Sequence, residues 1–264
     1  MGDVDSSSSS PNFKSFIPRS LAPFERYPNE LTQLRVRLGQ LLDHHVSLTG
    51  RVIGAGGQFF VVDMWVMGVA QRSFHLVEGF LQVFDGWHVT VAAPLVRFQI
   101  ENVYRTMYIL EAPNGPEVVL DILKGTELRK MKAFDNGALL TDAELVARAA
   151  RLFPWLPDVY TASNDWVHLS ERHVFNANRL GGDDAHPKLN GRVPLAAEDI
   201  PVTFLQELLA AMRQATRDLF ALLEVWEEWK LSHPGAESVG LDVARASTDN
   251  GTERGASNRV LKIG

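Results

Sequence analysis

The sequence predicts an all-α protein, folded as an antiparallel helical bundle of five to seven helices. Apolar residues recur at helical spacing through several long segments. Breaks rich in glycine and proline separate these segments, and short connections favour antiparallel packing of neighbouring helices. The segment near 176–196, rich in Gly, Asp and Asn, suits a small irregular or β-hairpin insertion. With 264 residues, of which 45% are hydrophobic and 22% charged, the chain has the composition of a soluble globular protein.

The first two helices are predicted in the N-terminal third of the chain. Asn29 can cap a helix that continues through LTQLRVRLGQLLDHHVSL, in which five leucines recur at helical spacing. The AGG tract at 55–57 breaks or bends the chain. A second helix is expected over roughly 58–84, and Asp85-Gly86 ends it.

Three further helices are predicted in the middle of the chain. One begins near Thr90 or Pro94 and runs through LVRFQIENVYRTMYIL until the APNGP tract stops it. Another spans roughly 117–134 and is closed by DNG. The TDAE motif is a capping box for the third, because Thr141 and Glu144 can satisfy each other's exposed backbone donors. The prolines of FPWLP end that helix.

Two helices and two polar ends complete the predicted organisation. One helix is expected from about 158 to 174, and the last long helix covers about 201–231, with apolar residues on one broad face. Residues 1–28 carry a run of five serines and four prolines, which predicts a disordered or extended arm. Residues 233–264 predict a disordered tail. The helical bundle domain is therefore expected over 29–232.

Charge, cysteine content and hydropathy exclude several classes of protein. The formal net charge of −6 gives no global basic field, so any contact with RNA must be local. The absence of cysteine excludes disulfides, thiolate metal ligands and thiol nucleophiles, and it suits the cytoplasm, where we expect this protein. The most apolar stretch, FFVVDMWVMGVA, is interrupted by Asp63 and is shorter than the ~20 residues of a membrane span. We therefore expect no membrane association.

Polar residues share a face on two of the central helices. On the second helix, His75 and Glu78 lie between two glutamines at helical spacing. On the third helix, Arg97, Glu101 and Arg105 follow at intervals of four. Either both stripes face water and form surface ion pairs, or they face inward and line a polar pocket. In the second reading Glu101 orients Arg97, which presents its planar guanidinium to an anion.

The same residues do not form the pattern of a known metal site. Di-metal sites in helical bundles use Glu-x-x-His on paired helices, whereas here the order is His75-x-x-Glu78 and it occurs once. His44 and His45 are adjacent, so they point to different sides of a helix. We expect neither a metal nor another cofactor.

The segment YTASNDWVHLSERHVFNA, residues 160–177, carries the main candidate site. Asn164 and His168 lie one helical turn apart, so they can reach the same small volume. A histidine can accept or donate a proton near neutral pH. Together with an amide that fixes a substrate and an arginine that neutralises a phosphate, it would make a minimal site for cleaving RNA. In such chemistry the 2′-hydroxyl attacks its own phosphate and no metal is required.

The segment SNDWVH at 163–168 resembles the R-N-x-x-V-H motif of HEPN domains. The RFQIE helix at 97–101, followed by YTAS at 160–163 and VHLS at 167–170, also resembles a group of uncharacterised bacterial helical proteins. The HEPN resemblance covers about 90–175. It implies a small helical bundle that often dimerises, in a family where many members are RNA-cleaving toxins or antiphage effectors.

This chain departs from the HEPN motif at one position. Asn164 and His168 match the motif, but the arginine position holds Ser163, which cannot bind a phosphate with a charged group. Two readings stay open. Either an arginine at another position supplies the charge, or the fold persists without nuclease activity. The candidate arginines are Arg97, Arg105 and Arg172, of which Arg172 follows His168 by four residues.

The functional hypothesis is a metal-independent RNA-cleaving protein, or a degenerate relative, in bacterial defence or stress response. His168 would transfer protons, Asn164 would position the substrate, and Arg97 with Glu101 would bind the anion. The expected partners are RNA and a second copy of this chain, and the identity of any neutralising protein stays open. The alternative is a non-enzymatic helical protein that senses a ligand or serves as a protein-interaction scaffold, in which His168 is buried and bonded within the fold.

Overall fold

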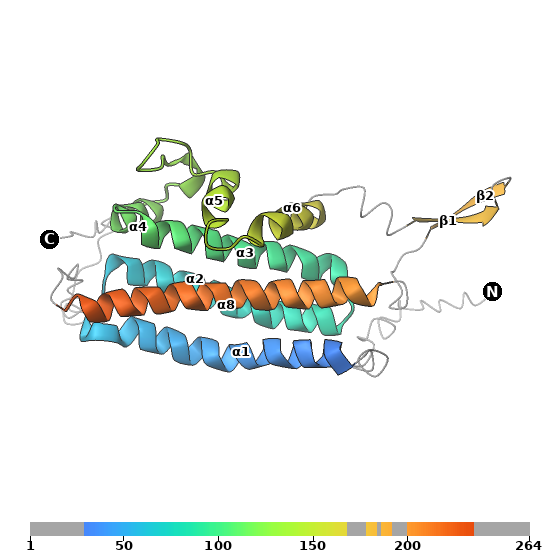
Figure 1. The fold of residues 1–264 in the computed structure, drawn as a ribbon, viewed down its shortest axis with the longest axis horizontal. Coiled ribbons are helices and arrows are strands. Elements are labelled where there is room, and N and C mark those ends of the chain that lie inside the picture. Colours follow the sequence, from blue (N-terminus) through green and yellow to red (C-terminus); the bar gives the residue numbers. More distant parts are fainter. Residues whose placement is uncertain (1–28, 168–177, 184–185, 192–199, 235–264) are drawn as a thin grey trace, which may run out of the picture.

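The protein is an all-α helical bundle, as predicted (Figure 1). The computed structural model describes residues 29–167, 178–183, 186–191 and 200–234. Four long helices run side by side in it, namely α1 (Asn29–Gly54), α2 (Val61–Asp85), α3 (Val89–Glu111) and α8 (Val202–Ser232). Helix α1 packs on α2 and α8, and α3 packs on the same two helices from the other side.

Three shorter helices cover the outer side of α3 (Figure 1). They are α4 (Gly115–Leu123), α5 (Asp142–Ala149) and α6 (Leu156–Val167). Because α2 and α8 pack on its other side, α3 is enclosed by five helices. Of its 23 residues, 14 are buried, and several of these are polar. The enclosure of α3 is what brings its polar side chains into the interior.

The helix predicted over roughly 117–134 is wrong in its length. Helix α4 ends at Leu123, where Gly125 takes a φ of 96° and the amide of Thr126 donates to the carbonyl of Asp121. A positive φ of this kind stops a helix and is readily adopted only by glycine. A short 3₁₀ turn, η4 (Leu128–Lys130), follows, and an isolated bridge pairs Lys132 with Leu139.

The first residues of two other helices test the proline and capping signals of the sequence. Helix α3 begins at Val89, so Pro94 lies inside the helix and not at its first position. Helix α5 begins where the TDAE motif predicts, and the Thr141 hydroxyl accepts a hydrogen bond from the Glu144 amide at 3.3 Å. The Glu144 carboxylate instead bonds Arg148, one turn further along the same helix.

A β-hairpin interrupts the helices between α6 and α8, within the segment predicted for one (Figure 1). Strand β1 (Asn178–Asp183) pairs antiparallel with β2 (His186–Gly191), with Leu180 opposite Leu189. The KLNG sequence lies in the second strand, as expected.

A fully buried ion pair joins three helices at one end of the bundle. Asp63 and Lys230 are both inaccessible to solvent, and their charged atoms lie 3.0 Å apart. The Lys230 ammonium also donates to the carbonyls of Val52 and Ile53, and the Trp226 indole donates to Asp63. A buried charge is tolerated when it is paired and hydrogen-bonded in this way. This explains why an aspartate interrupts the most apolar stretch of the sequence.

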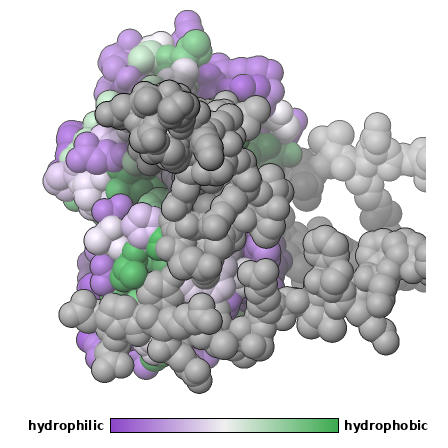
Figure 2. Space-filling view, turned by 90° about the vertical axis from the view of Figure 1, so that its right-hand side faces the viewer, coloured by the Kyte–Doolittle hydropathy of each residue, from purple (hydrophilic) through white to green (hydrophobic). Residues whose placement is uncertain are grey.

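The surface at the end where α8 begins is mixed in character. Its coloured part is largely hydrophilic, with smaller hydrophobic areas between (Figure 2).

Among the helices in the described ranges, none combines the length and the apolarity needed to cross a membrane. The predicted arm at 1–28 lies outside the described residues, as does the predicted tail apart from positions 233–234.

Candidate functional site

The polar stripe of α2 faces solvent. Gln71, His75, Glu78 and Gln82 are all exposed, whereas residues such as Val77 on the other arc of the helix are buried. Helix α2 packs on α1, α3, α4 and α8, and this leaves the polar arc in water. The reading in which His75 and Glu78 line an inward pocket is therefore wrong.

The arginine stripe of α3 is enclosed instead. The Arg97 side chain is only 8% exposed, and its Nη2 lies 2.9 Å from Oδ2 of Asp142 on α5. Its Nη1 donates to the Tyr104 hydroxyl at 3.0 Å, and its Nε donates to Oδ1 of Asn164 on α6 at 3.2 Å. The guanidinium carbon lies 4.2 Å from the centre of the Tyr160 ring. One buried cation thus joins α3, α5 and α6.

Glu101 pairs with two other arginines. Its Oε2 accepts a hydrogen bond from Arg72 of α2 at 3.0 Å, and its Oε1 forms an ion pair with Nη2 of Arg105 at 2.8 Å. Arg105 in turn lies 3.0 Å from Oδ1 of Asp142. The predicted Arg97–Glu101 pair is therefore replaced by an Arg97–Asp142 pair. The reason is that the first turn of α5 places Asp142 between Arg97 and Arg105, while Glu101 lies between Arg105 and Arg72.

These side chains form one charge cluster, made up of Arg72, Arg97, Glu101, Tyr104, Arg105 and Asp142. Its surroundings shift the pKa values of four of them, and the shifts of Tyr104 and Asp142 decide its charge state. Burial raises the pKa of the Tyr104 phenol, which therefore stays protonated. Burial alone would raise the pKa of Asp142, but its hydrogen bond with Arg105 and the charges of Arg105 and Arg97 outweigh that effect and lower it. The Asp142 carboxylate is therefore ionised at neutral pH and holds both arginines.

Helix α6 brings Asn164 to Arg97, whereas the neighbouring Ser163 turns into the helix. Ser163, at the position where the HEPN resemblance has arginine, is buried and its hydroxyl donates to the carbonyl of Tyr160 at 3.0 Å. His168 and Arg172 lie outside the described residues. Every guanidinium nitrogen of Arg97 already has a partner, so Arg97 holds Asn164 in place.

A chain of polar contacts leads from this cluster into the core. Nη1 of Arg72 donates to Oδ1 of Asn102 at 2.7 Å, and Nδ2 of Asn102 donates to Oε1 of Gln99 at 3.1 Å. Gln99 donates in turn to the hydroxyls of Ser73 and Thr216, at 2.7 and 3.2 Å. The amide of Asn102 is therefore fixed from both sides.

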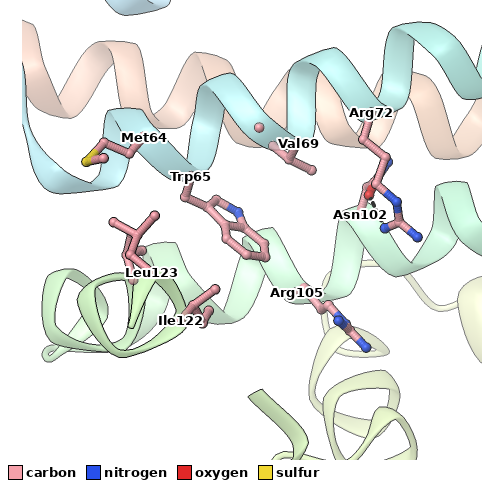
Figure 3. Close-up of a pocket in the computed structure, with 10 residues that line it drawn as sticks. Met64, Trp65, Val69, Arg72, Asn102, Arg105, Ile122 and Leu123 are labelled. Atoms are coloured by element: carbon pink, nitrogen blue, oxygen red, sulfur yellow. Dashed lines mark hydrogen bonds between the residues drawn. The ribbon is translucent and has the colours of Figure 1, made fainter. Parts of the chain in front are cut away.

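A pocket of about 180 Å³ lies between α2, α3 and α4 (Figure 3). The Trp65 indole projects into the space between these helices, with Met64, Ile122 and Leu123 on one side of it and Arg72 and Arg105 on the other. The lining residues are Met64, Trp65, Gly68, Val69, Arg72, Asn102, Arg105, Val119, Ile122 and Leu123. The pocket thus combines apolar walls with a polar edge.

Arg105 connects the pocket to the charge cluster. Both of its ion pairs involve Nη2. Its Nε is buried and has no hydrogen-bond partner within the part of the chain that the structure describes. An unpaired buried N–H is unfavourable, and this donor is closed off from solvent by the surrounding protein.

Several of these residues were not identified from the sequence. Asp142 had a signal, because it is the residue after the capping threonine and an acidic side chain is expected in the first helical turn. Tyr104 and Tyr160 lie within ordinary helical segments, and no local pattern marks them as partners of Arg97. Arg72 follows the glutamine of the α2 stripe directly, but its direction depends on where α3 packs.

No family model, no curated protein and no solved structure matches this chain. Within the described residues, no group of three or more histidine and acidic side chains is placed to hold a metal ion.

Proposed function

We propose that the protein binds a small molecule in the pocket between α2, α3 and α4 and acts as a helical ligand-sensing protein. The observation that carries the proposal is the pocket itself, whose apolar walls meet Arg72, Asn102 and Arg105 at one side. Small-molecule sites combine a mainly apolar lining with a few fixed polar groups.

The composition of the lining favours binding over catalysis. None of the residues that line the pocket is a nucleophile or exchanges protons near neutral pH. Its polar groups are held before any ligand arrives, since Arg72 is bonded to Glu101 and Asn102. Fixed polar groups reduce the entropy that binding costs, which supports a recognition role.

A pocket-filling variant tests this proposal. Gly68 lines the pocket, and a Cβ atom added there meets no atom within 4 Å, so Gly68→Leu fills the pocket without a clash at Cβ. Gly79→Leu is the matched control, because Gly79 lies on the same helix, is equally open at Cβ and does not line the pocket. A fragment library is screened by ligand-observed NMR against the parent and both variants.

We expect fragments that bind the parent to be lost in Gly68→Leu and kept in Gly79→Leu. Fragments that bind Gly68→Leu as well as the parent, or a library without a single binder, would contradict the proposal.

The second candidate is metal-independent RNA cleavage, and the contact between Arg97 and Asn164 favours it. Because Arg97 fixes the side-chain oxygen of Asn164, the Nδ2 group of that amide serves as the donor to the substrate in this candidate. His168 follows Asn164 by four positions in the sequence, and in this candidate it transfers the proton. Arg97 is then a positioning residue, and the phosphate charge falls to Arg105 or Arg172. The expected homodimer and the role in bacterial defence or stress response belong to this candidate.

A further inference from the structure

We infer that the pocket between α2, α3 and α4 takes a small uncharged ligand of about one ring, which packs against the indole of Trp65. This inference rests on the proposed function and names the chemical class of the ligand. Three observations support it: the apolar walls around the indole, the existing bonds of the polar side chains in the lining, and the size of the cavity.

The walls around Trp65 are apolar. Met64, Ile122 and Leu123 lie beside the indole on one side of the pocket (Figure 3). The indole nitrogen already donates to the Thr106 hydroxyl at 3.1 Å, so Trp65 offers the ligand a ring face and no free donor. Transfer of apolar surface from water to such walls is favourable. An aromatic ring can also pack on the indole in an offset or edge-on arrangement.

The polar side chains at the edge of the pocket are already bonded within the protein. Arg72 donates through Nη1 to Asn102 at 2.7 Å and through Nη2 to Glu101 at 3.0 Å. The Asn102 amide donates in turn to Gln99 at 3.1 Å, so both ends of this amide have a partner. A ligand that bonds these groups competes with contacts that they already make, and the net gain is therefore small.

Arg105 borders the pocket without offering it a hydrogen bond. Its Nη2 pairs with Glu101 and Asp142, and its buried Nε is closed off from solvent. Its guanidinium also points away from Trp65 (Figure 3). Arg105 therefore limits the space of the pocket but does not bond the ligand.

A charge of either sign on the ligand is unfavourable at this edge. An anion that approaches Arg72 also approaches Glu101, because the Oε2 atom of Glu101 lies 3.0 Å from Nη2 of Arg72. A cation in the pocket lies near the like charges of Arg72 and Arg105. In both cases the ligand loses hydration when its charged group enters a mainly apolar site. The lining thus favours a ligand without a charge.

The size of the cavity limits the ligand to about one ring. An apolar cavity of about 150 Å³ is large enough to hold benzene. The volume of about 180 Å³ found here therefore suits a single ring with a small substituent. Gly68 lines this space without a side chain, and a Cβ atom added there meets no atom within 4 Å.

Matched pairs of neutral and charged ring compounds test the inference by NMR titration of the full chain. Acetophenone is paired with benzoate, and benzyl alcohol is paired with benzylammonium, so the two members of a pair differ at one substituent. We expect at least one neutral compound to bind. Each neutral compound that binds should have a Kd at least about ten-fold lower than that of its charged partner, because only the charged group loses strong hydration.

The indole N–H signal of Trp65 locates the binding. The chain contains six tryptophans, and Trp65→Phe identifies the signal of Trp65 by its absence. A ring packed on this indole should shift that signal more than those of the other tryptophans. Gly68→Leu should abolish the shift, whereas Gly79→Leu, on the same helix but outside the lining, should retain it. Far-UV circular dichroism and Tm confirm that each variant is folded.

The outcomes separate the inference from the proposed function. Charged compounds that bind as tightly as their neutral partners, with binding lost in Gly68→Leu, would overturn the uncharged ligand and leave the binding function standing. A fragment library whose binders are lost in Gly68→Leu but are all charged would do the same. Neutral compounds that bind without moving the Trp65 signal would also overturn the inference. Absence of binding by all four probes and by the library would overturn both.

Discussion

Arg97 on α3 stacks on the ring of Tyr160 on α6, with its guanidinium carbon 4.2 Å from the ring centre. The same group pairs with Asp142 of α5 and donates to Asn164 of α6. Cation–π contacts with tyrosine are strongest where the cation is removed from water, as it is here. The two short helices α5 and α6 are therefore fixed to the bundle through one residue of α3.

Arg97→Ala should lower the free energy of unfolding by about 3 kcal/mol, because it removes the donor to the buried Tyr104 hydroxyl and the ion pair with Asp142. Urea denaturation followed by circular dichroism measures this loss. Arg151→Ala, at an exposed ion pair, should cost less than about 1 kcal/mol. Equal losses in the two variants would show that Arg97 does not join the helices.

The buried pair of Asp63 and Lys230 should behave as one unit. Lys230→Met leaves an unpaired carboxylate in the core and should cost about 3–5 kcal/mol. Asp63→Asn together with Lys230→Met should cost less than the sum of the two single variants, since neither charge is then left alone. A double-mutant cycle in urea gives the coupling. Strict additivity would mean that the two side chains do not stabilise each other.

The stability of the protein should depend on His45 in mildly acidic solution. His45 is buried, its ring packs edge-on against Phe74 and Phe220, and its Nε2 has no hydrogen-bond partner in the described part of the chain. Burial lowers the pKa of His45 in the folded protein. As the pH falls below about 6.5, the unfolded chain takes up a proton that the folded state resists, so stability is lost.

The pH dependence of unfolding isolates this contribution. Between about pH 7 and pH 5, the free energy of unfolding of the parent should fall more steeply than that of His45→Leu, which has no titrating group at this position. His75→Gln, at an exposed histidine, should retain the slope of the parent. Parallel curves for the parent and His45→Leu would rule out His45 as the cause.

The RNA-cleavage candidate makes its own prediction. His168→Ala should leave folding intact and abolish both the growth arrest on overexpression and the cleavage of RNA in the presence of EDTA. Asn164→Ala should reduce cleavage as well, because it removes the amide that Arg97 positions. Toxicity that persists in His168→Ala, or a parent that is neither toxic nor active on RNA, would eliminate this candidate and leave ligand binding.

The features that the sequence predicted well depend on neighbouring residues. The long helices follow from apolar residues at helical spacing, and the start of α5 follows from the hydrogen bond between Thr141 and Glu144. The hairpin follows from turn-forming residues within a short segment. The end of α4 was missed because its helical pattern continues past Gly125, whose positive φ stops the helix.

The features that were missed depend on contacts between distant segments. Arg97 and Asp142 are 45 positions apart, so their spacing in the sequence contains no sign of the ion pair. Asp63 was conspicuous in its apolar stretch, but its partner Lys230 lies 167 positions away. The direction of His75 stayed open between two readings, because the face of α2 that meets water is set by the packing of four other helices. The pocket requires α2, α3 and α4 to be in place at once.

The position of α8 has a consequence for synthesis of the chain. It packs against both α1 and α3, and Lys230 in its last turn bonds the end of α1 and the start of α2. On the ribosome, α1 to α3 emerge long before α8, and their apolar faces then have no cover. The nascent protein is therefore most prone to aggregation during this interval, and a chaperone that shields apolar helices would act before the chain is released.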